Sequence, residues 1–190
     1  MAHFRETAVM EDLDLSSRRG LDRGMVISLA EGQWIRDKHN LFLTGPTGAG
    51  KTFLACALGN AACRLSFSVR YYQAARLLQI LTLAHADGSY PKILAVLAKT
   101  QLLIIDDWLR NPLSEGQTQD LLEIVDDRYR QSSTLLVSQI PVADWHDRFA
   151  APTLSDAIMD RVIHNAYRIE ITGESMRKRK SLTQSGHQCL

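Results

Sequence analysis

Two short stretches of this chain carry the residue types that bind and cleave a phosphate anhydride. The first reads Gly-Pro-Thr-Gly-Ala-Gly-Lys-Thr over residues 45–52, a complete GxxxxGK[ST] pattern. Its glycines let the backbone form a concave nest whose N–H groups face phosphate oxygens, and the following helix adds the positive end of its dipole. The lysine of such a loop reaches the β and γ phosphates, and the hydroxyl holds Mg²⁺. The predicted nucleotide-binding residues are Gly45, Pro46, Thr47, Gly48, Ala49, Gly50, Lys51 and Thr52.

The second stretch is residues 101–107, Gln-Leu-Leu-Ile-Ile-Asp-Asp, in which an apolar run is followed by Asp106 and Asp107. A continuous apolar run is typical of a strand that is covered on both faces, and ligands bind at the carboxyl ends of such strands. In a phosphate-loop protein this pattern is a Walker B motif. It predicts that Asp106 holds Mg²⁺ and that Asp107 orients the attacking water. The alternative is a pair of solvated acids at the end of a strand.

Alternating strand and helix patterns surround both stretches. We expect strands over 40–44, 67–72, 101–107, 133–139 and 168–171. We expect helices over 21–38, 53–65, 74–85, 90–99, 114–130, 141–149 and 153–166. Strands that alternate with helices predict an α/β fold, with a parallel sheet between two layers of helices.

Three further residues have both a chemical and a structural interpretation. Gln139 and Ser138 end a predicted strand, where either could reach the γ phosphate or the attacking water, or could form a simple turn. Arg161 lies late in a predicted helix, where a single arginine is usually a surface ion-pair partner, here of Asp156 or Asp160.

The composition is that of one globular domain in a reducing cytoplasm. The 190 residues carry a net charge of +1 and three cysteines, and no apolar run is long enough to cross a membrane. Cys56 and Cys63 are predicted to share one buried stripe of the helix after the phosphate loop. Basic residues gather near the end, at Arg177, Lys178, Arg179 and Lys180, as a solvated end or a contact to a phosphate backbone.

Several phrases of the chain together resemble one family, the IstB-like transposition helper ATPases, a branch of the AAA+ proteins close to the DnaC helicase loaders. They include the phosphate loop with residues 54–59, the Walker B stretch 102–108, and phrases spread over most of the remaining chain. Those phrases cover 11–14, 19–23, 87–90, 120–124, 138–141, 145–146, 152–154, 160–166 and 173–178.

The resemblance implies an AAA+ core with a five-stranded parallel sheet, in which the strand before Gln139 lies between the two Walker strands. It implies that Gln139, with Ser138, is sensor 1, that Arg161 is an arginine finger offered to a neighbouring subunit, and that Arg177 is sensor 2. Asp107 takes the place of the usual catalytic glutamate. Family members bind ATP, assemble on duplex DNA as oligomers, and help a DDE transposase select its target.

The chain departs from the family pattern at two places. Family members have a helical segment ahead of the 11–14 phrase, and here about ten residues precede it, so we expect the ATPase core without that segment. The family tends to have glycine after Asp-Asp-Trp, where this chain has Leu109 followed by Arg110. We divide the chain into a lead-in (1–20), an AAA+ core (21–172) and a basic tail (173–190).

The function that we predict is an ATP-hydrolysing, DNA-associated helper of a transposase, with Lys51, Asp107, Gln139 and Arg161 as catalytic residues and Lys92 and Lys99 as DNA contacts. A DnaC-like loader of a replicative helicase is one alternative. Another is a nucleotide-gated assembly module with little hydrolysis, favoured by Asp107, Leu109 and the missing segment. A small-molecule kinase fits less well, because of the Asp-Asp ending and the late Arg161.

Overall fold

The computed structural model describes residues 4–13 and 20–172 and contains one five-stranded parallel sheet. The strands are β1 (Asn40–Thr44), β2 (Val69–Gln73), β3 (Leu102–Asp106), β4 (Ser133–Ser138) and β5 (Ala166–Glu170), in the order β2-β3-β4-β1-β5. The predicted α/β class is confirmed, and β4 lies between the two Walker strands β1 and β3. The phosphate loop, the Walker acids and Gln139 therefore follow strands that end at the same side of the sheet, here called the carboxyl edge. The opposite side is the amino edge.

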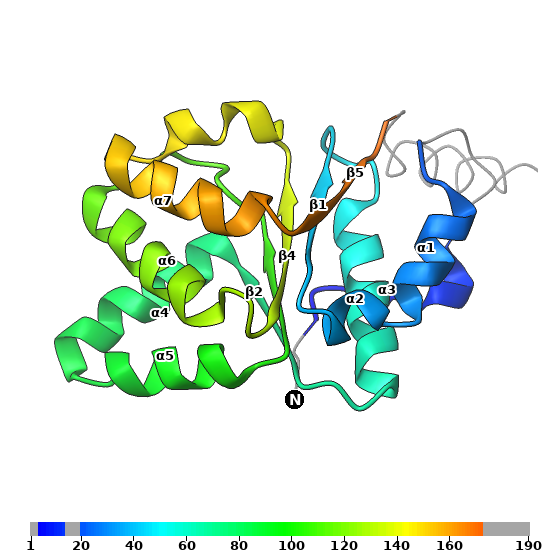
Figure 1. Cartoon of the computed structure of the whole chain (residues 1–190), viewed down its shortest axis with the longest axis horizontal. Coiled ribbons are helices and arrows are strands. Elements are labelled where there is room, and N and C mark those ends of the chain that lie inside the picture. Colours follow the sequence, from blue (N-terminus) through cyan, green and yellow to red (C-terminus); the bar gives the residue numbers. More distant parts are fainter. Residues whose placement is uncertain (1–3, 14–19, 173–190) are drawn as a thin grey trace, which may run out of the picture.

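Helices cover both faces of the sheet (Figure 1). One layer holds α1 (Arg23–Ala30), α2 (Gln33–Arg36) and α3 (Lys51–Arg64), and the other holds α4 (Ala74–Asp87), α5 (Tyr90–Lys99), α6 (Glu115–Arg128) and α7 (Pro152–Ile163). Successive strand residues point to opposite faces, so β1 contributes Leu41 and Leu43 to the first core and Phe42 to the second. The sheet is thus buried on both sides, which explains the continuous apolar runs.

Local signals account for several element boundaries. α5 begins at Tyr90 with Pro91 in its first turn, where the missing N–H has no helical partner to lose. α6 begins with a capping box in which Ser114 and Gln117 each bond the other's backbone N–H. α4 ends at Asp87 and is capped by Gly88, which is left-handed with φ 76°.

Three expectations are wrong. The single helix predicted over 21–38 is broken into α1 and α2, because Gly32 takes a left-handed φ of 74° between them. Residues 141–149 contain two short 3-10 turns, Val142–Asp144 and His146–Arg148, in place of a helix. Cys56 is buried against Ala8 in the middle of α3, whereas Cys63, on the same face of the helix, is exposed because it lies in the last turn.

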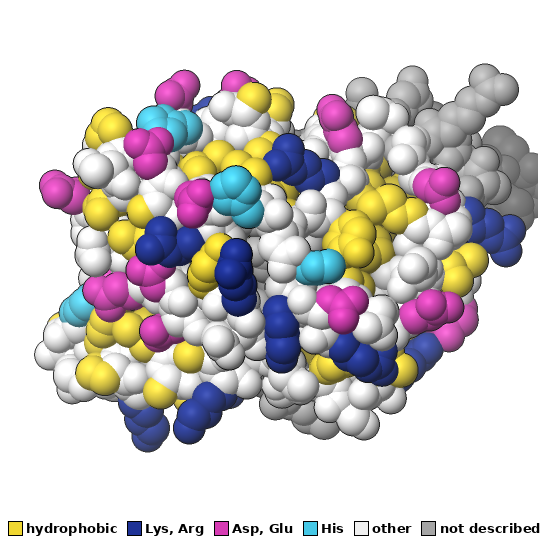
Figure 2. All heavy atoms as spheres, viewed as in Figure 1, with side chains coloured by type: hydrophobic (Ala, Val, Ile, Leu, Met, Phe, Trp, Pro, Cys, Tyr) yellow, Lys and Arg dark blue, Asp and Glu magenta, His cyan; other side chains and the backbone are white. Residues whose placement is uncertain are grey.

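The surface has mixed charge. Figure 2 shows Lys and Arg side chains in a band through the middle of one face, interspersed with Asp, Glu and His side chains. In the portion of the chain that the structure covers, none of the helices has both the length and the apolar character needed to span a bilayer.

Candidate functional site

The phosphate loop joins β1 to α3 at the carboxyl edge. Gly48 and Gly50 have φ values of 82° and 95°, which bend the backbone back toward the start of α3. Gly45 has φ 138°, and a Cβ atom there would lie 2.1 Å from the carbonyl oxygen of Ile171. Position 45 therefore admits no side chain unless the end of β5 moves away.

Lys51 is the first residue of α3, and its side chain is folded into the loop. Its Nζ donates to the carbonyl oxygens of Gly45 and Pro46 at 2.7 and 2.8 Å, and the residue is buried. Burial lowers the pKa of Lys51, while the nearby charges of Asp106 and Asp107 act in the opposite direction. A phosphate group would offer this ammonium a stronger acceptor than either carbonyl.

Asp106 is the centre of a hydrogen-bond network. Its Oδ2 accepts from the hydroxyl of Thr52 at 2.9 Å and from the phenol of Tyr71 at 2.7 Å, and its Oδ1 accepts from the backbone N–H of Asp107 at 2.8 Å. Burial, followed by the hydrogen bond to Asp106, raises the pKa of Tyr71, so this phenol stays a donor. The adjacent carboxylate and hydroxyl oxygens of Asp106 and Thr52 are the hard ligands that Mg²⁺ prefers.

The backbone turns after β3, so the side chain of Asp107 is placed differently from the buried side chain of Asp106. Asp107 has a left-handed φ of 58°, and its carboxylate is partly exposed toward the cavity. Trp108 is buried behind it. The backbone N–H of Trp108 donates to the carbonyl oxygen of Val137, and the backbone carbonyl oxygen of Trp108 accepts from the hydroxyl of Ser138, both at 2.8 Å. Ser138 therefore fixes the turn that carries Asp107.

Leu109 shows why this turn favours glycine. Its φ is 54°, in the left-handed region where a leucine side chain is strained, yet that side chain is buried in the core. The chain forms the turn in spite of the larger residue, so the departure at position 109 leaves the Walker B strand and both acids in place.

Gln139 follows β4 and reaches the phosphate loop. Its Oε1 accepts from the hydroxyl of Thr47 at 2.6 Å. Lys51, Thr52, Asp106, Asp107 and Gln139 thus come together from three strand ends around one cavity of about 330 Å³. Leu13, Leu21 and Leu54 add apolar side chains to its lining.

The sequence alone did not indicate Arg5, which lines this cavity, or Tyr71, which donates to Asp106. Arg5 Nη1 lies 3.5 Å from Asp107 Oδ2 and 3.9 Å from Asp106 Oδ2. Arg5 has no local pattern that could have marked it, because its partners follow it by about a hundred residues. The position of Tyr71 could have indicated its contact with Asp106. Tyr71 lies on β2, the strand next to the Walker B strand, and two residues later Gln73 pairs with Asp106.

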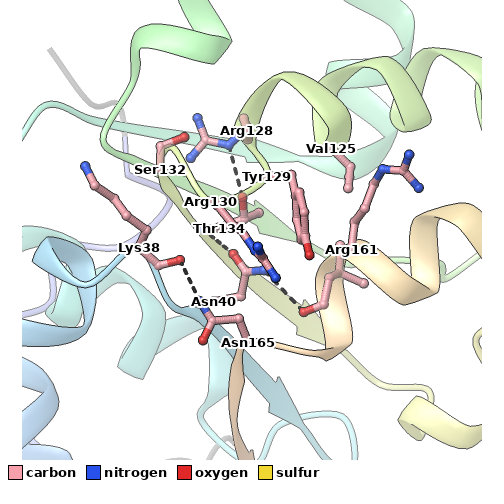
Figure 3. Close-up of a pocket in the computed structure, with 11 residues that line it drawn as sticks. Lys38, Asn40, Val125, Arg128, Tyr129, Arg130, Ser132, Thr134, Arg161 and Asn165 are labelled. Atoms are coloured by element: carbon pink, nitrogen blue, oxygen red, sulfur yellow. Dashed lines mark hydrogen bonds between the residues drawn. The ribbon is translucent and has the colours of Figure 1, made fainter.

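Arg161 lies elsewhere, at the amino edge. Figure 3 shows it rising from α7 toward α6, beside a small pocket of about 20 Å³ that also holds Arg128 and Asn40. It forms an ion pair with Asp126 and donates to the carbonyl oxygen of Ala157. The expected pairing with Asp156 or Asp160 is wrong, because these acids pair with His146 and His164.

The predicted DNA contacts Lys92 and Lys99 are not among the residues that line the cavity. Lys92 and Lys99 are exposed on α5. Arg177, with the rest of the basic tail, lies outside the described residues.

Comparisons with known proteins agree with the fold and the motifs. An insertion sequence ATP-binding protein of Sinorhizobium fredii is 49% identical over 177 residues, which are 93% of this chain and 72% of that protein. One from Pseudomonas fluorescens is 51% identical over 135 residues, 71% of this chain and 58% of that protein. The crystal structure of DnaI has a TM-score of 0.75 at 24% identity, covering 87% of this chain and 92% of that one.

The family model described as "IstB-like ATP binding protein" matches residues 1–184. The chain therefore belongs to the IstB-like ATP-binding protein family.

Proposed function

We propose that this chain binds ATP with Mg²⁺ in the carboxyl-edge cavity, hydrolyses it when copies of the chain assemble on duplex DNA, and assists a DDE transposase in target selection. The observation that carries the proposal is the arrangement of Lys51, Thr52, Asp106 and Asp107 around one cavity. The insertion sequence names of the relatives support a role in transposition.

Each side chain has a distinct task in this mechanism. Lys51 exchanges its two carbonyl partners for phosphate oxygens, and the loop N–H groups neutralise further phosphate charge. Thr52 and Asp106 would hold Mg²⁺, which supplies charge stabilisation to the transferred phosphoryl group when bound. Asp107 orients the attacking water, and Gln139, next to Thr47, senses the γ phosphate.

Arg161 completes the site of a neighbouring copy in this proposal. It lies at the opposite edge of the sheet from the cavity of its own chain, so it can serve only a nucleotide held by another subunit. An arginine supplied in this way changes the rate of phosphoryl transfer by ~10³ to 10⁵ in other NTPases. Hydrolysis should therefore require assembly.

The experiment measures ATP turnover against protein concentration, with and without duplex DNA, for the parent chain, Arg161→Ala and Asp126→Ala. We expect turnover to rise more than linearly in the parent and to fall by about 10³ in Arg161→Ala. Asp126→Ala is the matched control, since it breaks the same ion pair and keeps the arginine. Equal loss in both variants would show that the ion pair is structural. ATP binding without turnover would leave a nucleotide-gated assembly module.

DNA contact is tested separately with the double variant Lys92→Ala, Lys99→Ala. Its affinity for duplex DNA should fall for all sequences, and the slope of log affinity against log salt should become shallower by about 2. The control removes Arg36 and Arg64, two exposed cations of the other helical layer. An unchanged slope in the lysine variant would refute the proposed contact.

The transposase role is tested by co-purification of the chain with the transposase of its own insertion sequence. Retention that depends on ATP supports the role. Retention of a replicative helicase in its place would support the loader alternative.

A further inference from the structure

The N-terminal segment of residues 4–13 packs on α3, the helix that begins with Lys51. The ring of Phe4 lies over Gly59, where an added Cβ atom would be 2.5 Å from a ring carbon of Phe4. The rings of Phe4 and Tyr71 meet edge to face, with their centroids 6.2 Å apart. Ala8 is fully buried, and its carbonyl oxygen accepts from the side chain of Asn60. The segment is therefore held in one position relative to the phosphate loop.

A salt bridge adds to this docking at the far end of α3. Glu11 Oε1 and Arg64 Nη1 lie 2.7 Å apart, with both side chains more than half exposed. Neither Glu11 nor Arg64 is itself among the residues that line the cavity. Removing Arg64 therefore weakens one contact of the segment and keeps every side chain that lines the cavity.

The docked segment places the guanidinium of Arg5 at the Walker B acids. Its Nη1 lies 3.5 Å from Asp107 and 3.9 Å from Asp106, and its side chain is 42% exposed toward the cavity. Thr52 and Tyr71 already donate to the Asp106 oxygen that Arg5 approaches. Asp106 thus does not depend on Arg5 for its hydrogen bonds.

The same place receives the terminal phosphate of a bound ATP. Lys51, Thr52 and Asp106 are the groups that meet the β and γ phosphates and their metal ion, and Asp107 lies on the side of the attacking water. A guanidinium has several N–H donors in a planar fork, so it can hold a carboxylate and a phosphate oxygen together. ADP brings no third phosphate to this position.

We propose that Arg5 determines nucleotide specificity: it contacts the terminal phosphate of ATP from within the same chain and so favours ATP over ADP. The inference rests on the proposed function, since it concerns the same cavity. It assigns to the N-terminal segment a direct part in reading the nucleotide state.

The experiment measures the dissociation constants of ATP and ADP, both with Mg²⁺, by calorimetry for the parent chain, Arg5→Ala, Arg5→Lys and Arg64→Ala. In Arg5→Ala the affinity for ATP should fall about tenfold, the loss expected for one charge-assisted hydrogen bond, while that for ADP stays within about twofold. Arg5→Lys should keep part of the preference, because it keeps the charge without the fork. Arg64→Ala should preserve the ratio of the two affinities.

Other outcomes separate the possible failures. An unchanged ATP-to-ADP ratio in Arg5→Ala would overturn the inference and leave the proposed function standing. The same change of ratio in Arg64→Ala would also overturn it, because docking of the segment would then be the cause. A parent chain that binds neither nucleotide would refute the proposed function, and the inference with it.

Discussion

Arginine side chains lie at both edges of the sheet, in opposite circumstances. At the amino edge Arg128 is buried and donates to the carbonyl oxygens of Leu97, Thr100 and Ser133 and to the hydroxyl of Thr134. Burial lowers its pKa to about 9, which still leaves it charged at neutral pH. At the carboxyl edge Arg5 is partly exposed, lies 3.5 Å from Asp107 and 3.9 Å from Asp106, and faces a cavity of about 330 Å³.

The difference teaches how to separate a structural cation from one that is available to a ligand. The pocket beside Arg128 has a volume of about 20 Å³, close to the room of one water molecule. The guanidinium of Arg128 already donates to three backbone carbonyl oxygens and one hydroxyl. Arg5 has room beside it, and within residues 4–13 and 20–172 its guanidinium has only the carboxylates of Asp106 and Asp107 as partners. Free hydrogen-bonding capacity next to an open cavity distinguishes the functional edge, while burial alone does not.

The largest expected effect is on stability, at the amino edge. Arg128→Ala leaves three carbonyl oxygens and a hydroxyl without their partner in a buried place, so the free energy of unfolding should fall by roughly 3–5 kcal/mol. For a domain of this size the midpoint of thermal unfolding should fall by about 10 °C. Urea denaturation followed by circular dichroism measures the loss. A loss below about 1 kcal/mol would contradict the structural role.

Lys51→Ala should show the reverse pattern at the carboxyl edge. It removes a buried ammonium whose partners are two loop carbonyls, so stability should change by less than about 1 kcal/mol, while ATP affinity falls by about 100-fold. Calorimetry on the folded variant measures the affinity. Strong destabilisation would remove the distinction between the two edges.

Tyr71→Phe tests the metal side of the cavity. Loss of the phenol removes one donor from Asp106 and leaves Thr52 in place, so ATP affinity with Mg²⁺ should change by about tenfold at most. ATP affinity in EDTA should stay the same, because Asp106 then holds no metal. A change of equal size in EDTA would show that Tyr71 acts on the loop and not on the metal ligand.

The smallest effect concerns the left-handed residue Leu109. Leu109→Ala and Leu109→Gly both lose the buried side chain, but glycine also relieves the φ of 54°. The glycine variant should therefore be more stable than the alanine variant by about 1 kcal/mol, the opposite of the usual order. Urea denaturation of the two variants gives the difference between their free energies of unfolding. A more stable alanine variant would contradict the left-handed turn.

The sequence predicts those features that depend on neighbouring residues. β1 and α5 have the predicted bounds, because apolar runs, Pro91 and turn residues mark them locally. The gathering of Lys51, Thr52, Asp106 and Gln139 also follows, since the ends of parallel strands meet at one edge. These residues occur in local patterns, so a parallel sheet is enough to bring them together.

Features that depend on distant residues do not appear in the sequence pattern. Arg128 looks like any arginine at the end of an amphipathic helix, and its acceptors belong to α5 and β4. Arg5 lies in a stretch without periodicity, and only the docking of Phe4 and Ala8 on α3 brings it to the acids. The break at Gly32 likewise follows from a left-handed turn that helical periodicity does not show.

The pairing of β1 determines when a newly made chain can first hold a nucleotide. β1 precedes the phosphate loop, yet it pairs only with β4 and β5, at Ser133–Ser138 and Ala166–Glu170. Gly45 in turn lies against Ile171, just after β5. During synthesis the loop therefore leaves the ribosome long before the strands that support it, and we expect ATP to bind only after β5 has been added. A chain that stops before Ala166 would carry the complete phosphate loop sequence without a formed site.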